Sequence, residues 1–299
     1  MPTPTAPARE RTPLDLDGVL TIGQLAARTG LTPEVLRMWE TRHGFPVPVR
    51  LPSGHRRYTD ADVDDVLRVL RLREGGVHLD QAIRRVRSSD EAAEASVYAV
   101  LRHRYADLPS YTLTKQTLLA LSWAIEDESL AQARRPLLIG AFQSGRYFSP
   151  SQKRWRELSR SARSAYVLAE LDDPDDSATP RRVGLPADAP LLREWIVLVD
   201  DPGLTAALVA WEIPGQDDLA DRDRLFEAVW SLEPEVVRTA SLAALAIAAD
   251  AGSLAAIPER SRLASEPLPA PTSQRIATEL FNRMVAYADG TILMARRGR

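Results

Sequence analysis

The stretch LTIGQLAARTGLTPEVLRMWETRH, residues 20–43, decides how the first part of this 299-residue chain folds. Thr21 and Gln24 have the spacing of a capping box, in which the threonine hydroxyl and the glutamine side chain each accept a bond from an orphan backbone N–H. A helix is therefore expected directly after Thr21, and Gly30 is expected to end it in the left-handed conformation. A second helix should begin at Pro33, because threonine caps helices and proline is tolerated at the first position. Two short helices joined by three residues form a helix-turn-helix.

An arginine-rich hairpin is expected directly after the second helix. Several prolines and the run Pro52-Ser53-Gly54 mark turns between residues 45 and 58. Arginines on such a hairpin could hold phosphates or enter a minor groove, as a wing does. A solvated charged loop is the alternative, but a hairpin behind a capped helix-turn-helix favours contact with DNA. The candidate DNA-binding residues of the second helix and the hairpin are Arg37, Trp39, Thr41, Arg42, Arg50, His55, Arg56, Arg57 and Tyr58.

Two further helices are expected to complete a first domain that covers residues 18–87. Thr59 caps one helix that Gly75 and Gly76 end, and apolar residues at helical spacing mark a short helix over residues 79–86. Residues 20–87 hold twelve arginines against eight acidic residues, a balance of +4 in a chain whose total is −3. Positive charge is therefore concentrated in the part that is expected to meet DNA.

Three motifs in this order carry a resemblance to a known family. They are LTIGQLAARTGL at 20–31, LRMWETR at 36–42 and GHRRY at 54–58. Together they resemble the winged-helix DNA-binding domain of MerR-family transcriptional regulators. The pair Trp39-Glu40 and the run Gly44-Phe45-Pro46 are similar to the branch of light- and cobalamin-responsive repressors. The resemblance implies that a homodimer binds double-stranded promoter DNA at two-fold half-sites, with RNA polymerase as a further candidate partner.

Composition limits the remaining function classes. The chain has no cysteine, which excludes disulfides, thiolate metal sites and cysteine-based redox sensing, and no metal or cofactor is expected. Residues 1–17 are rich in Pro, Thr and Arg and lack an apolar core, which predicts a disordered arm and not a signal peptide. No apolar run reaches the ~20 residues that a membrane span needs. The sequence therefore predicts a soluble, cytoplasmic protein with no membrane contact.

The region from residue 88 to residue 132 is expected to be mostly helical. A connecting helix is expected to start near residue 88 and to run to about Tyr105, and Leu108-Pro109-Ser110 breaks it, so the connecting segment covers 88–110. A longer helix is expected over about 113–132. Either helix could supply the contact of a two-fold dimer. The alternative is that both helices belong to the core of a second domain.

From residue 135 the hydrophobic pattern changes to that of strands. Strands are expected at 136–142, 164–171, 194–199 and 206–213, and helices at 152–162 and 222–249. The second of these helices could break at Glu233-Pro234. Asp201-Pro202-Gly203 should turn a hairpin, and the acidic stretch 171–190 is expected to be a solvated loop and not a metal cluster. This order predicts a mixed sheet with helices against it. The whole chain is therefore assigned to the α+β class, with a winged helix-turn-helix, connecting helices and a mixed α/β sensory domain.

A second resemblance covers residues 111–252. LALSWAIEDE at 119–128, GAFQ at 140–143, WREL at 155–158 and Trp211-Glu212 are similar to the DICT domain, a sensory module fused to MerR-type DNA-binding domains and to cyclic-dinucleotide signalling enzymes. The family implies an input role without dictating a ligand. A cobalamin site is not expected, because no histidine follows His103.

Aromatic and arginine side chains near the expected strand ends could form a small-molecule pocket. Core packing would use the same residues. The candidate ligand-binding residues are Phe142, Arg146, Trp155, Trp195 and Trp211.

The last part of the chain adds a separate element. Residues 253–272 are expected to be a proline-rich linker, and residues 273–299 a C-terminal helix and tail. The apolar stripe of this helix, which includes Leu280, Phe281 and Met284, must be buried against its own domain or against a partner subunit.

The residue types that carry chemistry argue against catalysis. Without a histidine after His103, a serine nucleophile in the second domain has no usual base, and no Gly-rich phosphate loop is present. No catalytic residue is assigned. The sequence predicts a DNA-binding transcription regulator, not an enzyme, whose second domain senses a signal such as a small molecule and alters promoter binding or geometry. The alternative is a signalling interaction protein whose second domain docks a protein partner while DNA binding localises it.

Overall fold

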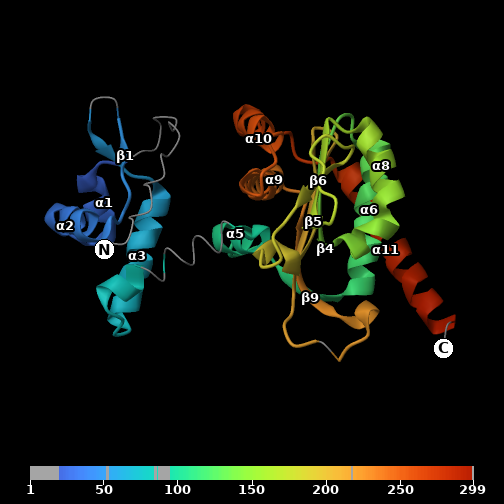
Figure 1. Ribbon diagram of the computed structural model, residues 1–299, viewed down its shortest axis with the longest axis horizontal. Coiled ribbons are helices and arrows are strands. Elements are labelled where there is room, and N and C mark those ends of the chain that lie inside the picture. Colours follow the sequence, from blue (N-terminus) through green and yellow to red (C-terminus); the bar gives the residue numbers. More distant parts are fainter. Residues whose placement is uncertain (1–19, 52–53, 84–85, 87–94, 217, 298–299) are drawn as a thin grey trace. The chain divides into compact units, whose positions relative to one another are not determined.

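The computed structural model describes residues 20–51, 54–83, 86, 95–216 and 218–297 (Figure 1). The chain divides into two compact units, Met1–Glu91 and Ala92–Arg299, and each unit has its own hydrophobic core. The arm expected at 1–17 and the start of the connecting helix expected at 88 lie outside the described residues.

The first unit follows the capping signals of the sequence. Its elements are α1 (Ile22–Thr29), α2 (Pro33–His43), β1 (Val49–Arg50), β2 (Arg56–Arg57) and α3 (Asp60–Glu74). Thr21 and Gln24 form the capping box of α1, and Gly30 ends that helix at a φ of 71°. Thr59 and Asp62 form a second capping box at the start of α3. The helix starts predicted from these residues are confirmed, and residues 79–83 are also helical.

One core holds the first unit together. Leu25 of α1, Leu36 and Trp39 of α2 and Val66 of α3 are buried in it. Met38 of α2 is apolar but exposed. Leu36 and Trp39 lie three positions apart and already define the buried stripe of α2, so the intervening Met38 faces solvent.

The second unit is built on a seven-stranded mixed sheet. Its strands are β3 (Ser110–Thr114), β4 (Leu137–Ser144), β5 (Ser164–Glu170), β6 (Arg181–Gly184), β7 (Glu194–Asp201), β8 (Leu204–Glu212) and β9 (Leu225–Ser231). They lie in the order β3-β9-β8-β7-β4-β5-β6, with parallel pairing within β4-β5-β6 and antiparallel pairing elsewhere. Asp201 pairs with Leu204, which confirms the predicted hairpin. The mixed sheet is confirmed as well.

Helices cover both faces of this sheet (Figure 1). They are α5 (Val97–Arg104), α6 (Lys115–Gln132), α7 (Gly145–Phe148), α8 (Gln152–Ser161), α9 (Pro234–Asp250), α10 (Ala256–Ser265) and α11 (Gln274–Arg297), with the short 3-10 helices η1 (Ser149–Ser151), η2 (Pro190–Arg193) and η3 (Asp221–Asp223). One core joins the sheet to α5, α9 and α10, and the other joins it to α6, α8 and α11. Leu245 lies in the first of these cores and Trp155 in the second.

The helix expected over 222–249 is wrong in its first half. Residues 225–231 form β9 instead, and α9 begins only at Pro234. In β9 the side chains of Phe226 and Ala228 enter one core while Val229 enters the other, the period-two pattern of a strand buried on both faces. Pro234 occupies the first position of α9, where its missing N–H costs nothing.

Three further boundaries differ from the predictions. β3 precedes the helix expected at 113, so α6 starts at Lys115, and β6 lies within the loop expected at 171–190. The linker expected at 253–272 contains α10, whose Leu263 is buried against α9 and whose Pro258 lies in its first turn, where a helix accepts proline. Short edge strands and proline-containing helices lack a strong periodic signal, which is why the sequence pattern missed them.

The C-terminal helix packs on its own unit. Leu280 and Met284 of α11 are buried in the core that α6 also lines. Beside them Arg283 Nε lies 3.1 Å from a carboxylate oxygen of Glu128, and the Tyr287 hydroxyl donates to Asp127. Phe281, on the other side of α11, stays 59% exposed. Among the described residues no helix is long and apolar enough to cross a membrane.

Candidate nucleic-acid interface and sensory pocket

Helix α2 presents the first group of candidate DNA contacts. Its start is set by the Thr32 hydroxyl, which accepts from the Val35 N–H, and its end by Gly44 at a φ of 62°. With Leu36 and Trp39 facing the core, the side chains of Arg37, Thr41 and Arg42 are left on the exposed face. These three residues are therefore the candidate DNA contacts of α2. Arg37 has one carboxylate neighbour, Glu34 one turn earlier, at 3.5 Å.

The hairpin of β1 and β2 presents the second group. Val49 pairs with Arg57 and Arg50 with Arg56. The side chains of Arg50, His55 and Arg56 are exposed, and that of Arg57 is half-buried. The described residues near the end of the hairpin are therefore largely basic, as the sequence predicted.

Glu40 ties the hairpin to α2. Its carboxylate is largely buried, lies 2.9 Å from the Nε of Arg56, and accepts a hydrogen bond from the Tyr58 hydroxyl. Burial first, and then the bond to Glu40, raise the pKa of Tyr58 well above its ordinary value, so the phenol stays a donor. Backbone hydrogen bonds also join Tyr58 to the residue before α1. The Leu20 N–H donates to the Tyr58 carbonyl at 2.7 Å, and the Tyr58 N–H donates to the Leu20 carbonyl at 2.9 Å.

Two of the predicted DNA contacts need correction. Trp39 is 1% exposed and Tyr58 is fully buried, so neither side chain can reach a DNA surface. Trp39 packs near Phe45 in the core of the first unit, with ring centroids 6.3 Å apart. Glu40, which the sequence reasoning did not select, does the positioning. Its sequence position gives no local signal, because Glu34 is another acidic residue on the same helix.

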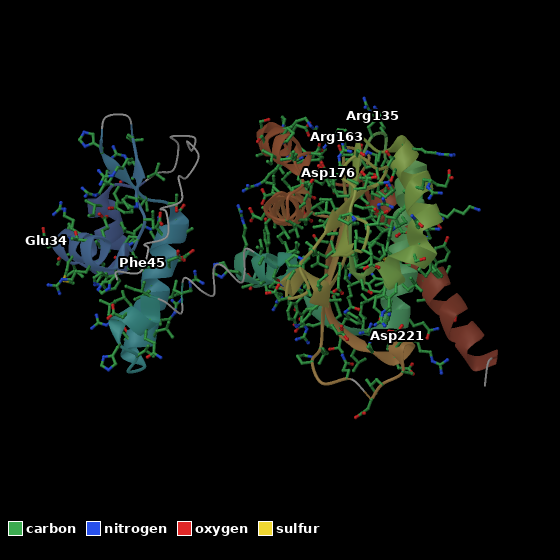
Figure 2. All side chains as sticks on the ribbon, viewed as in Figure 1. Glu34, Phe45, Arg135, Arg163, Asp176 and Asp221 are labelled. Carbon is green, nitrogen blue, oxygen red and sulfur yellow. The ribbon has the colours of Figure 1, made fainter. Side chains whose placement is uncertain are left out.

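The second unit contains an open pocket of about 430 Å³ at one end of its sheet. Figure 2 places Asp221 at this end and Asp176 and Arg163 at the other end of the same unit. The pocket lies where β8 ends and β9 begins, next to η2. Its lining residues are Tyr147, Arg193, Glu212, Ile213, Pro214, Gly215, Gln216, Leu219, Asp221 and Arg224.

Ion pairs and hydrogen bonds connect most of the polar groups at this pocket. Arg224 lies 2.6 Å from Glu212 and 3.0 Å from Asp221. Lys115 Nζ lies 2.6 Å from Asp221 and 3.8 Å from the centre of the Tyr147 ring. Burial lowers the pKa of Lys115. Burial opposes ionisation of Asp221 too, but the bond and charge of Lys115 outweigh it and hold the pKa of Asp221 below its ordinary value.

None of the five predicted ligand residues lines this pocket. Trp155 is buried, donates to Glu126 at 3.2 Å, and stands edge-on to Phe142. Trp195 is half-buried and donates to the Ser122 hydroxyl at 2.8 Å. These three aromatic residues pack against α6 and α8, which is the core-packing alternative. Their role in ligand binding is therefore withdrawn.

The other two predicted ligand residues border the pocket through a neighbour. Arg146 is exposed and donates to the Tyr147 hydroxyl at 2.8 Å. The guanidinium of Arg193 lies over the ring of Trp211, 5.2 Å from its centre. Arg193 and Arg224 are pocket residues that the sequence did not indicate, because η2 and the segment between β8 and β9 come together only in the folded sheet.

A buried carboxyl group lies next to the pocket residue Arg193. Glu194, the first residue of β7, is fully buried and accepts from the backbone N–H of Tyr98, at the start of α5, at 2.9 Å. Burial raises the pKa of Glu194 to about 8, although its hydrogen bonds act in the opposite direction. Among the described residues, no cluster of three or more His, Cys, Asp or Glu side chains could hold a metal ion.

Family models match both units. The model described as "MerR HTH family regulatory protein" matches residues 20–89, and the DICT model, described as "Sensory domain in DIguanylate Cyclases and Two-component system", matches residues 94–213. The first match contains α2 and the hairpin. The second contains Tyr147, Arg193 and Glu212 of the pocket but ends before Arg224.

Three relatives show how far the similarity extends. The HTH-type transcriptional regulator CueR of Vibrio cholerae is 31% identical over 105 residues, which cover 33% of this chain and 76% of CueR. The HTH-type transcriptional repressor CarH of Myxococcus xanthus is 38% identical over 72 residues, 24% of each chain. The HTH-type transcriptional activator TipA of Streptomyces coelicolor is 28% identical over 186 residues, 56% of this chain and 72% of TipA. The chain thus spans only about a quarter of the length of CarH.

Proposed function

Because this chain belongs to the MerR family of helix-turn-helix regulatory proteins, we propose that it regulates transcription by binding promoter DNA and that its second unit senses a small-molecule signal. In this proposal residues 18–87 bind double-stranded DNA, residues 88–110 connect, and residues 111–252 sense. The single observation that carries the proposal is the basic surface that α2 and the hairpin present together. Arg37, Arg42, Arg50 and Arg56 are exposed there on two elements that Glu40 joins.

The geometry of these two elements assigns different tasks to them. A helix enters the major groove and reads base edges, whereas an arginine hairpin holds phosphates or a minor groove. We expect Arg37, Thr41 and Arg42 to supply base choice, and the hairpin arginines to supply affinity and register. Glu40 then keeps the two groups at a fixed separation.

Several partners belong to the same proposal. We expect a homodimer, because a two-fold pair of half-sites requires two copies of α2, and we expect RNA polymerase as a promoter-bound partner. Both helices expected to supply the dimer contact pack in cores of the second unit: α6 against the sheet and α11, and α5 in the core that α9 lines. We therefore keep either segment as the proposed dimer contact. We also expect a cytoplasmic location, where promoter DNA is accessible.

Binding without catalysis is the proposed mode of sensing. At the pocket both carboxylates are engaged by internal cations, which leaves no free general base there among the described residues. A ligand can shift DNA binding only if its affinity differs between two arrangements of the dimer. No catalytic step is required.

The proposal is tested by identifying the bound DNA and then changing one base-reading residue. Genomic DNA bound by the full chain is sequenced, and affinity for the enriched site is measured for the parent, Arg37→Ala and the control Arg160→Ala, an exposed arginine of α8 in the other unit. We expect Arg37→Ala to lower affinity for that site by about 10-fold or more, and for unrelated DNA much less. Absence of any enriched site, or equal effects of the two substitutions, contradicts the proposal.

A second candidate function rests on α11. Phe281 and Val285 remain 59% and 52% exposed on the side of α11 that faces away from α6. Such a pair suits a protein partner, as in a signalling interaction protein that DNA binding merely localises. This function would be favoured if the full chain formed a stable complex with a protein partner, Phe281→Ser abolished that complex, and the chain bound no small molecule.

A further inference from the structure

We propose that the pocket between Tyr147, Arg193 and Arg224 binds a small anionic molecule through a carboxylate or phosphate group, with Arg193 as its main anchor. This inference rests on the proposed sensory function and specifies the chemistry of its ligand. The expected site around Phe142 and Trp155 is not available, because those side chains fill the core.

The pocket has the size and walls of a small-molecule site. Its volume of about 430 Å³ lies within the ~300–1,000 Å³ that is typical of such sites. Ile213, Pro214 and Leu219 supply an apolar wall, and Tyr147 supplies an aromatic one. A ligand with a compact apolar body therefore fits beside the charged groups.

The acceptors of the pocket are already used. Glu212 pairs with Arg224 at 2.6 Å and also accepts from the Gln143 amide. Asp221 accepts from Lys115 and, at 3.2 Å, from the Tyr147 hydroxyl. A cationic ligand would have to displace these internal partners before it could bind either carboxylate.

Donors, in contrast, remain available. Arg193 is exposed at the pocket, and among the described residues it has no carboxylate within 4.0 Å; only the Trp211 ring lies against it. The Nε of Arg224 is buried without a hydrogen-bond partner in the described part of the chain. Four cationic side chains lie against the rings of Tyr147 and Trp211, namely Lys115, Arg146, Arg193 and Arg224. The two carboxylates that line the pocket, Glu212 and Asp221, offset only half of that charge. The partner that completes this arrangement is an anion, since Arg binds carboxylate and phosphate in bidentate geometry.

Arg193 also links the pocket to the connecting segment, residues 88–110. Arg193 is followed directly by Glu194, whose carboxylate holds the N-terminus of α5 through the Tyr98 N–H. α5 is the first described helix after residues 87–94, the segment that leads from the DNA-binding unit. An anion that draws Arg193 toward the pocket therefore acts on the residue that fixes α5, which gives ligand binding a physical route to the connecting segment.

Calorimetry with matched probes tests the inference on the full chain. The probes are benzoate, phenyl phosphate and benzamide, which share one apolar ring and differ in charge. We expect benzoate or phenyl phosphate to bind the parent with a millimolar Kd and benzamide not to bind. The preferred anion distinguishes a carboxylate ligand from a phosphate ligand.

Two substitutions make the test specific. Arg193→Gln keeps a polar side chain but removes its charge and its guanidinium fork, and we expect it to weaken binding of the preferred anion by about 10-fold or more. Arg160→Gln, on exposed α8, removes an equal charge and should leave the Kd unchanged. Failure of both anions to bind the parent, equal binding of benzamide, or equal effects of the two substitutions would overturn the inference.

DNA binding by the parent is measured on the same preparation, so that the two failures can be distinguished. If the parent binds a specific site but neither anion, the ligand inference fails and the DNA-binding function stands. If the parent binds no specific site, the proposed function fails whatever the calorimetry shows.

Discussion

Glu40 and Arg56 form an ion pair that joins α2 to the hairpin, with 2.9 Å between a carboxylate oxygen and the guanidinium Nε. The same carboxylate accepts from Tyr58, which is fully buried. An acidic residue within a DNA-binding surface reduces attraction for phosphates. Its burial and its two donors indicate that it holds α2 and the hairpin together, at the separation that the proposed DNA contacts need.

The first prediction concerns this junction. Glu40→Gln removes the charge that Arg56 and Tyr58 share, so we expect a loss of about 1–2 kcal/mol in the free energy of unfolding of the first unit. DNA affinity should fall for every sequence, because the hairpin is no longer fixed relative to α2. Chemical denaturation and fluorescence anisotropy measure the two effects. Glu34 is an exposed carboxylate on the same helix, so Glu34→Gln is the control. If both variants lost the same stability and the same DNA affinity, Glu40 would not be the residue that joins α2 to the hairpin.

The second prediction concerns the attachment of α11. Glu128 is fully buried and Arg283 is its ion-pair partner, so Arg283→Ala leaves a buried carboxylate without its cation. Because the Arg283 side chain is about one-third exposed, we expect a cost of about 1–3 kcal/mol, below that of a fully buried pair. Arg275→Ala breaks the exposed pair with Glu279 and should cost less than about 0.5 kcal/mol. Urea denaturation that gives the two variants the same midpoint would exclude this role for Arg283.

The third prediction concerns the packing of β4 against α8. A Cβ on Gly140 would lie 2.5 Å from two ring atoms of Trp155, which is buried and cannot move away. We expect Gly140→Ala to destabilise the second unit by about 1–3 kcal/mol. Gly145→Ala, whose Cβ would meet its nearest neighbours at 3.5 Å, is the matched control. Thermal unfolding of both variants checks the difference, and a Gly140→Ala protein as stable as the parent would show that Trp155 has room to shift.

The fourth prediction concerns pH. The pKa of Glu194 is about 8 in the folded chain against an ordinary value of 4.5, so between these pH values the folded state binds more protons than the unfolded state. The contribution of Glu194 to stability is therefore fully present below pH 4.5 and is lost as the pH rises toward 8, by at most about 1.4 kcal/mol per pH unit. Glu194→Gln keeps an acceptor for the Tyr98 N–H and should flatten this slope. Denaturation curves at several pH values give the free energy of unfolding of parent and variant. If that free energy changed equally with pH in both proteins, Glu194 would not be the titrating group.

Local signals predicted the first unit well. Thr21, Gly30, Pro33 and Thr59 act on backbone groups within a few residues, and the structure places helix boundaries where they predict. The direction of Trp39 was the weaker inference, because a helical pattern alone does not say which apolar side chain is closest to the core. The bond between Glu40 and Arg56 joins residues sixteen positions apart and has no signature in either segment.

The second unit was harder to predict for a related reason. The segment LFEAVWS at 225–231 is apolar enough for a helix or for a strand buried on both faces. Only its pairing between β8 and β3 in the sheet makes it a strand. The predicted aromatic site failed because Gly140, with no side chain, leaves space that Trp155 fills. The pocket depends on Tyr147, Arg193 and Arg224, which only the folded sheet brings together.

The most direct measurement is how the affinity for the enriched DNA site depends on salt concentration. It is made on the parent and on the double variant Arg50→Ala/Arg57→Ala, which leaves the ion pair between Glu40 and Arg56 intact. Lys153→Ala/Arg160→Ala on α8 is the control with the same loss of charge. If the hairpin holds phosphates, the first variant binds all DNA more weakly and its slope of log affinity against log salt is shallower by about one unit for each lost contact, while the control matches the parent. Parent-like affinity and slope in the hairpin variant would contradict the claim that this surface binds DNA.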